Sequence, residues 1–346
     1  NGVTPLYFAA QNGHIHTVFL LLSLGAKIDQ ANNDGATPLF IAAQNGCTDT
    51  VILLLSYRAE IDQAVNNGAT PLFIAVYSGH MDTVSLLLSN GAKVDQANNN
   101  GDTPLYVAAA NGRNDTISVL LSHGANINQA NKNGATPLFI ASYSGHVNTV
   151  PLLLLNGAKV DQANNNGTTP LHIVAQSGRN DMVSLLLSHR AKIDQAMHNG
   201  VTPLFIAAKN GNDDTISLLL SIGAKIDKAT NDGCSPLWIA AQSGHMSTVS
   251  LLLSNGDKID QAMNVLDNGA TPLYAAAQNG YNDMVSLLLS KGAKIDEAKN
   301  SGATPLIVAA KNGHNHTIAL LLSNGAKIDQ ANNVLISFEQ ILLLWY

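Results

Sequence analysis

Aspartates are the residues of this sequence that could most readily do chemistry, and most of them recur at one fixed position. A pair of carboxylates can hydrolyse a glycoside when one of them holds a proton as the general acid. Regular recurrence is more typical of a scaffold, so we expect the row to form hydrogen bonds between neighbouring hairpins. The row consists of Asp29, Asp62, Asp95, Asp161, Asp194, Asp227, Asp260, Asp296 and Asp329.

Three other aspartates break this regularity, and they are the candidates for catalysis. They are Asp102, Asp232 and Asp267. If the chain is an enzyme, these residues predict an unusual, glycoside hydrolase-like use of acids. The sequence contains no nucleophile elbow and no phosphate-binding glycine loop, so we expect no cofactor.

Histidine pairs near the two ends are the only hint of a metal site. His14 and His16 occupy the same places in the first repeat as His314 and His316 in the last. A zinc site needs two further ligands at a suitable spacing, and the sequence offers none. We therefore expect no bound metal.

The elements that must position these side chains are repeated along the chain. Ten Thr-Pro or Ser-Pro pairs occur; eight prolines are 33 residues apart, and steps of 36 and 33 follow. Ten units of 33 residues, three inserted residues and a 13-residue tail account for all 346 residues. A period of this length predicts a stack of repeats. The prolines are Pro5, Pro38, Pro71, Pro104, Pro137, Pro170, Pro203, Pro236, Pro272 and Pro305.

Each unit has its own start and stop signals. In the second unit Thr37 can cap a helix that begins at Pro38, and Gly46 can end it. Asp49 lies near the start of a second helix that carries the leucines 53–55. Neither helix is long enough to persist alone in water, so neighbouring units must bury its apolar face.

The repeated unit, with Thr37-Pro38-Leu39, two alanines, Gly46 and a leucine triplet, resembles the ankyrin repeat over residues 1–333. The resemblance implies an elongated all-α solenoid of ten helix-turn-helix units with short β-hairpin loops, which binds a protein or peptide on its concave face. It also implies that turn histidines such as His80 bond to the backbone. One departure is that mostly aromatic residues replace the family's histidine after Thr-Pro-Leu, and histidine itself occurs there only at His172.

Positions that contact partners in this family are occupied here mostly by Asn, Ala, Gln or Ser. The exceptions cluster in the middle units, and tyrosines among small polar residues are typical of protein-binding surfaces. Neutral drift in a recently duplicated array is the competing interpretation of these residues, and a structural spacer is a separate alternative function. The predicted partner-binding residues are Tyr77, Asp102, Lys132, Tyr143, Thr168, His198 and Lys209.

Composition limits the remaining classes of function. The net charge is −6 and only 12% of residues are charged, which argues against a nucleic-acid surface. No apolar run approaches the length of a membrane span. The sequence shows no signal peptide, and its two cysteines, Cys47 and Cys234, lie in distant repeats. We expect an intracellular, cytoplasmic protein.

A few local irregularities carry their own expectations. Arg58 and Arg190 stand where most units have a helix-ending glycine, and Pro151 should delete a helix hydrogen bond unless that helix starts late. The insertion near 264–267 should lengthen a hairpin tip. We expect the apolar, non-repeat tail 334–346 to cap the last repeat and to promote dimerisation.

Overall fold

The computed structural model describes residues 2–263 and 269–331 of the chain. These residues form twenty α-helices and no β-strand, in repeated helix-turn-helix units. No helix among them is long and apolar enough to cross a membrane. The chain divides into two compact units, Asn1–Asn165 and Asn166–Tyr346, and the boundary falls between the fifth and sixth repeats.

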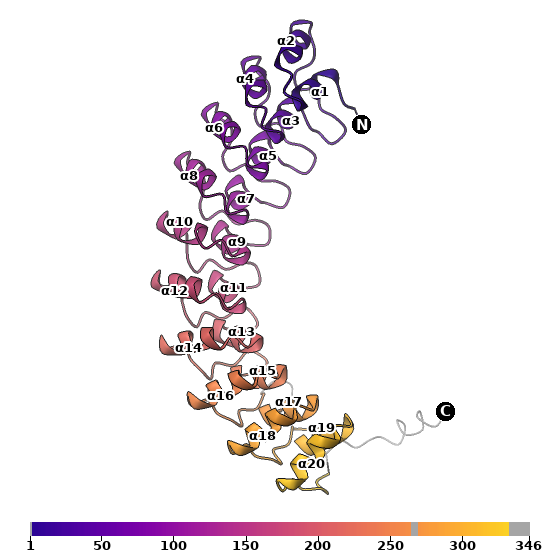
Figure 1. Ribbon diagram of the computed structural model, residues 1–346, viewed down its shortest axis with the longest axis vertical. Helices are drawn as coiled ribbons and strands as arrows, with labels where there is room; N and C mark the ends of the chain where they lie inside the picture. Colours follow the sequence, from indigo (N-terminus) through magenta and orange to yellow (C-terminus); the bar gives the residue numbers. More distant parts are fainter. Residues whose placement is uncertain (1, 264–268, 332–346) are drawn as a thin grey trace, which may run out of the picture. The chain divides into compact units, whose positions relative to one another are not determined.

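Five repeats make up the first unit. The first helices of its repeats pack one against the next in a row, and the second helices lie beside them in another row (Figure 1). The helices are α1 (Pro5–Gln11), α2 (Ile15–Ser23), α3 (Pro38–Gln44), α4 (Thr48–Ser56), α5 (Pro71–Ser78), α6 (Met81–Ser89), α7 (Pro104–Ala110), α8 (Asn114–Ser122), α9 (Pro137–Ser144) and α10 (Thr149–Leu155).

The second unit has the same plan. Its first helices, α11 to α19 in odd numbers, again pack in sequence order. The helices are α11 (Pro170–Gln176), α12 (Asn180–Ser188), α13 (Pro203–Asn210), α14 (Asp213–Ser221), α15 (Pro236–Ser243), α16 (Met246–Ser254), α17 (Pro272–Asn279), α18 (Asn282–Ser290), α19 (Pro305–Lys311) and α20 (Asn315–Ser323).

The predicted start and stop signals are confirmed. The Thr37 hydroxyl accepts the N–H of Phe40 at 3.1 Å, and Pro38 follows it as the first residue of α3. Gly46, after the end of α3, has φ 68°. The helices are only seven to nine residues long, so their apolar residues are buried mainly by neighbouring helices. Leu39 and Leu54, for example, have no exposed surface.

Two arginines occupy the left-handed position that ends a second helix. Arg58 and Arg190 both have φ 65°, the only non-glycine residues with positive φ among those described. Gly91 holds the equivalent position in the third repeat, where an added Cβ would meet no atom within 4 Å. A side chain in this conformation strains the backbone, and glycine does not.

We therefore expect Arg58→Gly to raise the free energy of unfolding by up to about 1 kcal/mol. The reverse change at a matched site, Gly91→Ala, should lower it by a similar amount. Chemical denaturation of the two variants beside the wild type measures both effects. A clear loss of stability in Arg58→Gly would show instead that the arginine side chain makes a contact that the fold needs.

Pro151 does not delete a helix hydrogen bond, because its helix starts late. α10 begins at Thr149, whereas α6 in the third repeat begins two positions earlier, at Met81. Pro151 is thus the third residue of α10. The N–H of any residue at this position would have no partner within the helix, so proline removes no helix hydrogen bond. The expected insertion near 264–267 and the tail 334–346 lie outside the described residues.

Candidate functional site

Polar side chains in the turn between the two helices link several repeats to the one before. His80 Nε2 donates to the carbonyl oxygen of Gln44 at 3.0 Å, and His146 Nε2 donates to that of Ala110 at 2.8 Å. His245 and His314 do the same in the second unit. The prediction that turn histidines bond to the backbone is confirmed at these four sites. No group of three metal-binding side chains occurs in residues 2–263 and 269–331.

The aspartate row also joins neighbouring repeats. Asp62 Oδ1 accepts the N–H of Lys93 at 3.0 Å, and Asp194 Oδ1 accepts that of Lys225 at 3.1 Å. Asp29, Asp95, Asp260 and Asp296 accept equivalent bonds from the following repeat. The expected scaffold role is therefore confirmed for these six members of the row.

Two exposed tyrosines mark one surface of the first unit. Tyr77 near the end of α5 is 58% exposed, and Tyr143 near the end of α9 is 64% exposed. Both lie at the same position of their repeats, and Ala110 holds that position on α7 between them. Because α7 packs against both α5 and α9, the three residues form one row. We call this row the tyrosine surface.

An arginine that the sequence analysis did not select lies beside Tyr77. Arg113 Nη2 donates to the carbonyl oxygen of Tyr77 at 2.9 Å. Its guanidinium covers Gly79, where an added Cβ would lie 1.4 Å from Nη1. Arg113 forms no ion pair among the described residues, although a guanidinium carries five N–H donors. It therefore adds an uncompensated positive charge next to the tyrosine surface.

The predicted residue Asp102 is held by the hairpin loops. Its Oδ1 accepts from Asn131 Nδ2 at 2.9 Å, and its Oδ2 accepts from Asn98 Nδ2 at 3.3 Å. Burial raises the pKa of the nearby Tyr106 to about 12, and the charge of Asp102 adds to this effect. Lys132 is exposed, and its backbone N–H donates to the carbonyl oxygen of Asn100 at 2.9 Å. Asp102 thus has the contacts of a structural residue.

In the second unit the remaining candidates fall in different environments. Thr168 is only 8% exposed, so its side chain is not on the surface where a partner would contact it. His198 and Lys209 are exposed. Of the candidate acids, Asp232 is exposed, and Asp267 lies outside the described residues.

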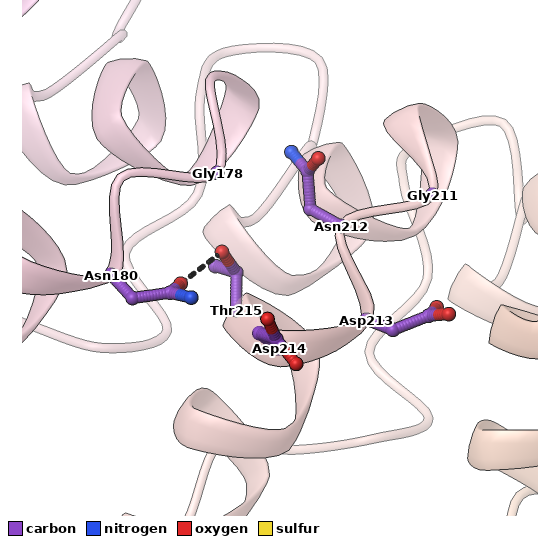
Figure 2. Close-up of a pocket in the computed structure, with 7 residues that line it drawn as sticks. All are labelled: Gly178, Asn180, Gly211, Asn212, Asp213, Asp214 and Thr215. Atoms are coloured by element: carbon purple, nitrogen blue, oxygen red, sulfur yellow. Dashed lines mark hydrogen bonds between the residues drawn. The ribbon is translucent and has the colours of Figure 1, made fainter.

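Pockets occur at equivalent places along the turns between helices. One of about 390 Å³ is lined by Gly178, Asn180 and 211–215 (Figure 2). Its Thr215 hydroxyl donates to Asn180 Oδ1 at 2.6 Å, while the Asp213 side chain points away from this pair. A pocket of about 480 Å³ beside Arg113 and one of about 300 Å³ beside Tyr281 share this position. Their recurrence indicates that they arise from the repeat itself.

The second-helix row of the first unit carries an apolar patch that the sequence analysis missed. Phe19 is 53% exposed and Ile52 49% exposed, at a position that is serine in most other repeats. The ring of Phe19 meets that of Tyr57 edge-on, with centroids 6.5 Å apart. The replacement of a repeated serine by Phe and Ile was the available sequence signal.

Within residues 2–263 and 269–331, His172 is the one fully buried histidine. Its Nδ1 accepts the backbone N–H of Thr169, and its Nε2 donates to the carbonyl oxygen of Val201 at 3.1 Å. It has no exposed surface. Burial lowers the pKa of His172 to about 4, and the bond to Val201 opposes this shift only in part. The imidazole is therefore neutral at neutral pH and serves the fold.

Comparison with known families agrees with this architecture. The family model of ankyrin repeats matches residues 1–65, 58–131, 124–197, 191–263 and 258–332. The chain therefore belongs to the ankyrin repeat family, whose members generally serve as scaffolds for protein interactions. No curated protein matches the sequence.

Proposed function

We propose that this chain binds a protein or peptide through the tyrosine surface of its first unit. The observation that carries the proposal is the exposure of Tyr77 and Tyr143 on helices that are otherwise packed. Rigid aromatic side chains give large contact areas at little cost in conformational entropy, and they often dominate binding energy. Helices that already pack in a row present them without a further ordering cost.

The spacing of the rings favours an extended partner. Neighbouring helices pack roughly 8–10 Å apart, so helices two positions apart in the row are separated by roughly 16–20 Å. An extended chain rises about 3.3 Å per residue, and five or six residues therefore span this distance. We expect the partner to place two apolar side chains at about that interval, with small or polar residues over Ala110.

The charge beside Tyr77 favours an acidic residue in the partner. Arg113 has unused N–H donors and no carboxylate partner among the described residues. A guanidinium binds a carboxylate through paired hydrogen bonds. Asp115 lines the same pocket as Arg113 but forms no ion pair with it. An acidic residue close to the apolar side chain on Tyr77 would complete the contact.

A random-peptide library displayed against the intact chain tests the proposal. Peptides that bind the Tyr77→Ala/Tyr143→Ala double variant are removed first, and peptides that bind the wild type are then enriched from the remainder. We expect enriched sequences with two apolar residues five or six positions apart. If repeated rounds recover only peptides that bind both proteins equally, the tyrosine surface is not the binding site.

Variants of Arg113 separate its charge from its role in the fold. Arg113→His restores the turn residue seen at His80 and His146, which keeps the bond to the preceding repeat and removes the permanent charge. We expect an enriched acidic peptide to bind this variant about ten times more weakly, with unchanged protein stability. Arg113→Lys should retain part of the affinity. Equal affinity for all three proteins would exclude the acidic contact.

A further inference from the structure

A carboxylate interrupts a position that alanine holds in every other repeat. Three residues after the last residue of each second helix, the chain has an alanine, such as Ala224 in the seventh repeat, and the eighth repeat has Asp257 instead. The Asp257 residue is only 8% exposed, the same fraction as Ala224. An ionisable group thus occupies a space that elsewhere contains a methyl group.

Asp257 also takes a hydrogen bond that elsewhere joins two repeats. The N–H of Lys225 in the seventh repeat donates to Asp194 Oδ1 in the sixth, at 3.1 Å. The equivalent N–H in the eighth repeat, that of Lys258, donates at 2.8 Å to its own neighbour Asp257 and not to Asp227 in the seventh. A hydrogen bond between two repeats is therefore replaced by one within a single repeat.

The second oxygen of this carboxyl group lacks a partner. Asp257 Oδ2 is buried, and it accepts no hydrogen bond within residues 2–263 and 269–331. The charged groups that act on Asp257 are Asp227, from the preceding repeat, and Lys258, the next residue. Burial, together with the charge of Asp227, raises the pKa of Asp257 to about 7 against the opposing effects of Lys258. Ionising a buried carboxyl that has no full set of partners costs free energy.

We propose that the junction between the seventh and eighth repeats is a proton-dependent joint, which is closed while Asp257 is protonated and opens first when Asp257 ionises beside Asp227. Because each repeat contacts only its neighbours, a weakened interface divides the stack into two segments that unfold separately. Near neutral pH both the closed form, with Asp257 protonated, and the open form, with Asp257 ionised, should be populated.

The direction of the pH effect follows from proton linkage. A carboxyl whose pKa is about 7 when folded and 3.8 when unfolded binds its proton more tightly in the folded state. The stability it contributes is fully present below pH 3.8 and is lost as the pH rises through about 7. Opening of the joint should therefore increase on the order of 30-fold between roughly pH 5.5 and 8.5.

Hydrogen exchange of the full chain tests this joint. The measurement compares amides of residues 255–261 with the matched segment 222–228, at both pH values and corrected for intrinsic exchange rates. We expect the wild type to lose protection in 255–261 at the higher pH. Asp257→Ala, which restores the residue of the other repeats, and Asp257→Asn should remove this dependence. If either variant keeps the full loss of protection, the proposal is wrong.

A transplanted aspartate provides an independent check. Ala224→Asp places a carboxyl group at the same position one repeat earlier, where Lys225 now bonds to Asp194. In the Asp257→Ala background, it should move the pH-dependent opening to residues 222–228. Opening that stays at 255–261 in this double variant would contradict the proposal, because Asp257 is then absent.

Discussion

Protonation of His172 on acidification is expected to cost the second unit up to about 3 kcal/mol of stability between pH 7.5 and pH 4, in opposition to the effect of Asp257. His172 has no exposed surface, and its pKa falls from 6.5 to about 4 because burial disfavours the charged ring. Between these values the unfolded chain binds a proton that the folded chain does not. The stability contributed by the neutral ring is therefore present above pH 6.5 and lost as the pH falls towards 4.

His172→Phe is the matched control, because Phe139 and Phe205 occupy the same position in neighbouring repeats. The variant loses the bonds to Thr169 and Val201, so it should be somewhat less stable at neutral pH. Between pH 6.5 and 4 the wild type should lose stability relative to this variant. Hydrogen exchange of α11 and α13 amides measures this difference locally. Parallel pH profiles for the two proteins would show that His172 does not titrate in this range.

Loss of both tyrosines is expected to remove nearly all affinity for a peptide that uses the tyrosine surface. Tyr77→Ala and Tyr143→Ala should each cost on the order of 1–2 kcal/mol of binding free energy. The two positions are two repeats apart, so their effects should add to about 2–4 kcal/mol, or roughly 30- to 1,000-fold in Kd. Titration of each variant with an enriched peptide measures these values.

Protein stability should not change in the tyrosine variants, because both side chains are mostly exposed. Gln11→Ala and Gln44→Ala alter the same position in the first two repeats, and they serve as controls for affinity. If the control variants weaken binding as much as the tyrosine variants do, the peptide binds elsewhere in the row.

The fold could be predicted closely because each repeat contains the residues that start and end its own helices. Thr37 caps a helix, Pro38 starts it and Gly46 ends it through interactions within about ten residues. The aspartate row and turn histidines could be assigned to the scaffold for the same reason, since a residue repeated at fixed spacing meets the same neighbour each time. Asp62 and His80 illustrate this.

Prediction of the site was weaker because a departure from the repeat does not reveal where its side chain lies. Thr168 and Asp102 both differ from their equivalents, yet one is buried and the other bonds to two asparagines. Arg113 did not stand out in the sequence, because arginine recurs at the same position in the sixth repeat. Asp257 could have been found, since it alone replaces a repeated alanine, but its buried oxygen is visible only in the structure.

The most direct test of the binding proposal is a hydrogen-exchange footprint of the chain with and without an enriched peptide. We predict increased protection in segments 71–80, 104–113 and 137–146, which contain the tyrosine surface and Arg113. The matched segments 203–212 and 236–245 of the second unit should be unchanged. Protection confined to α2 and α4, where Phe19, Ile52 and Tyr57 form the exposed apolar patch, would contradict the proposal and assign binding to the second-helix row.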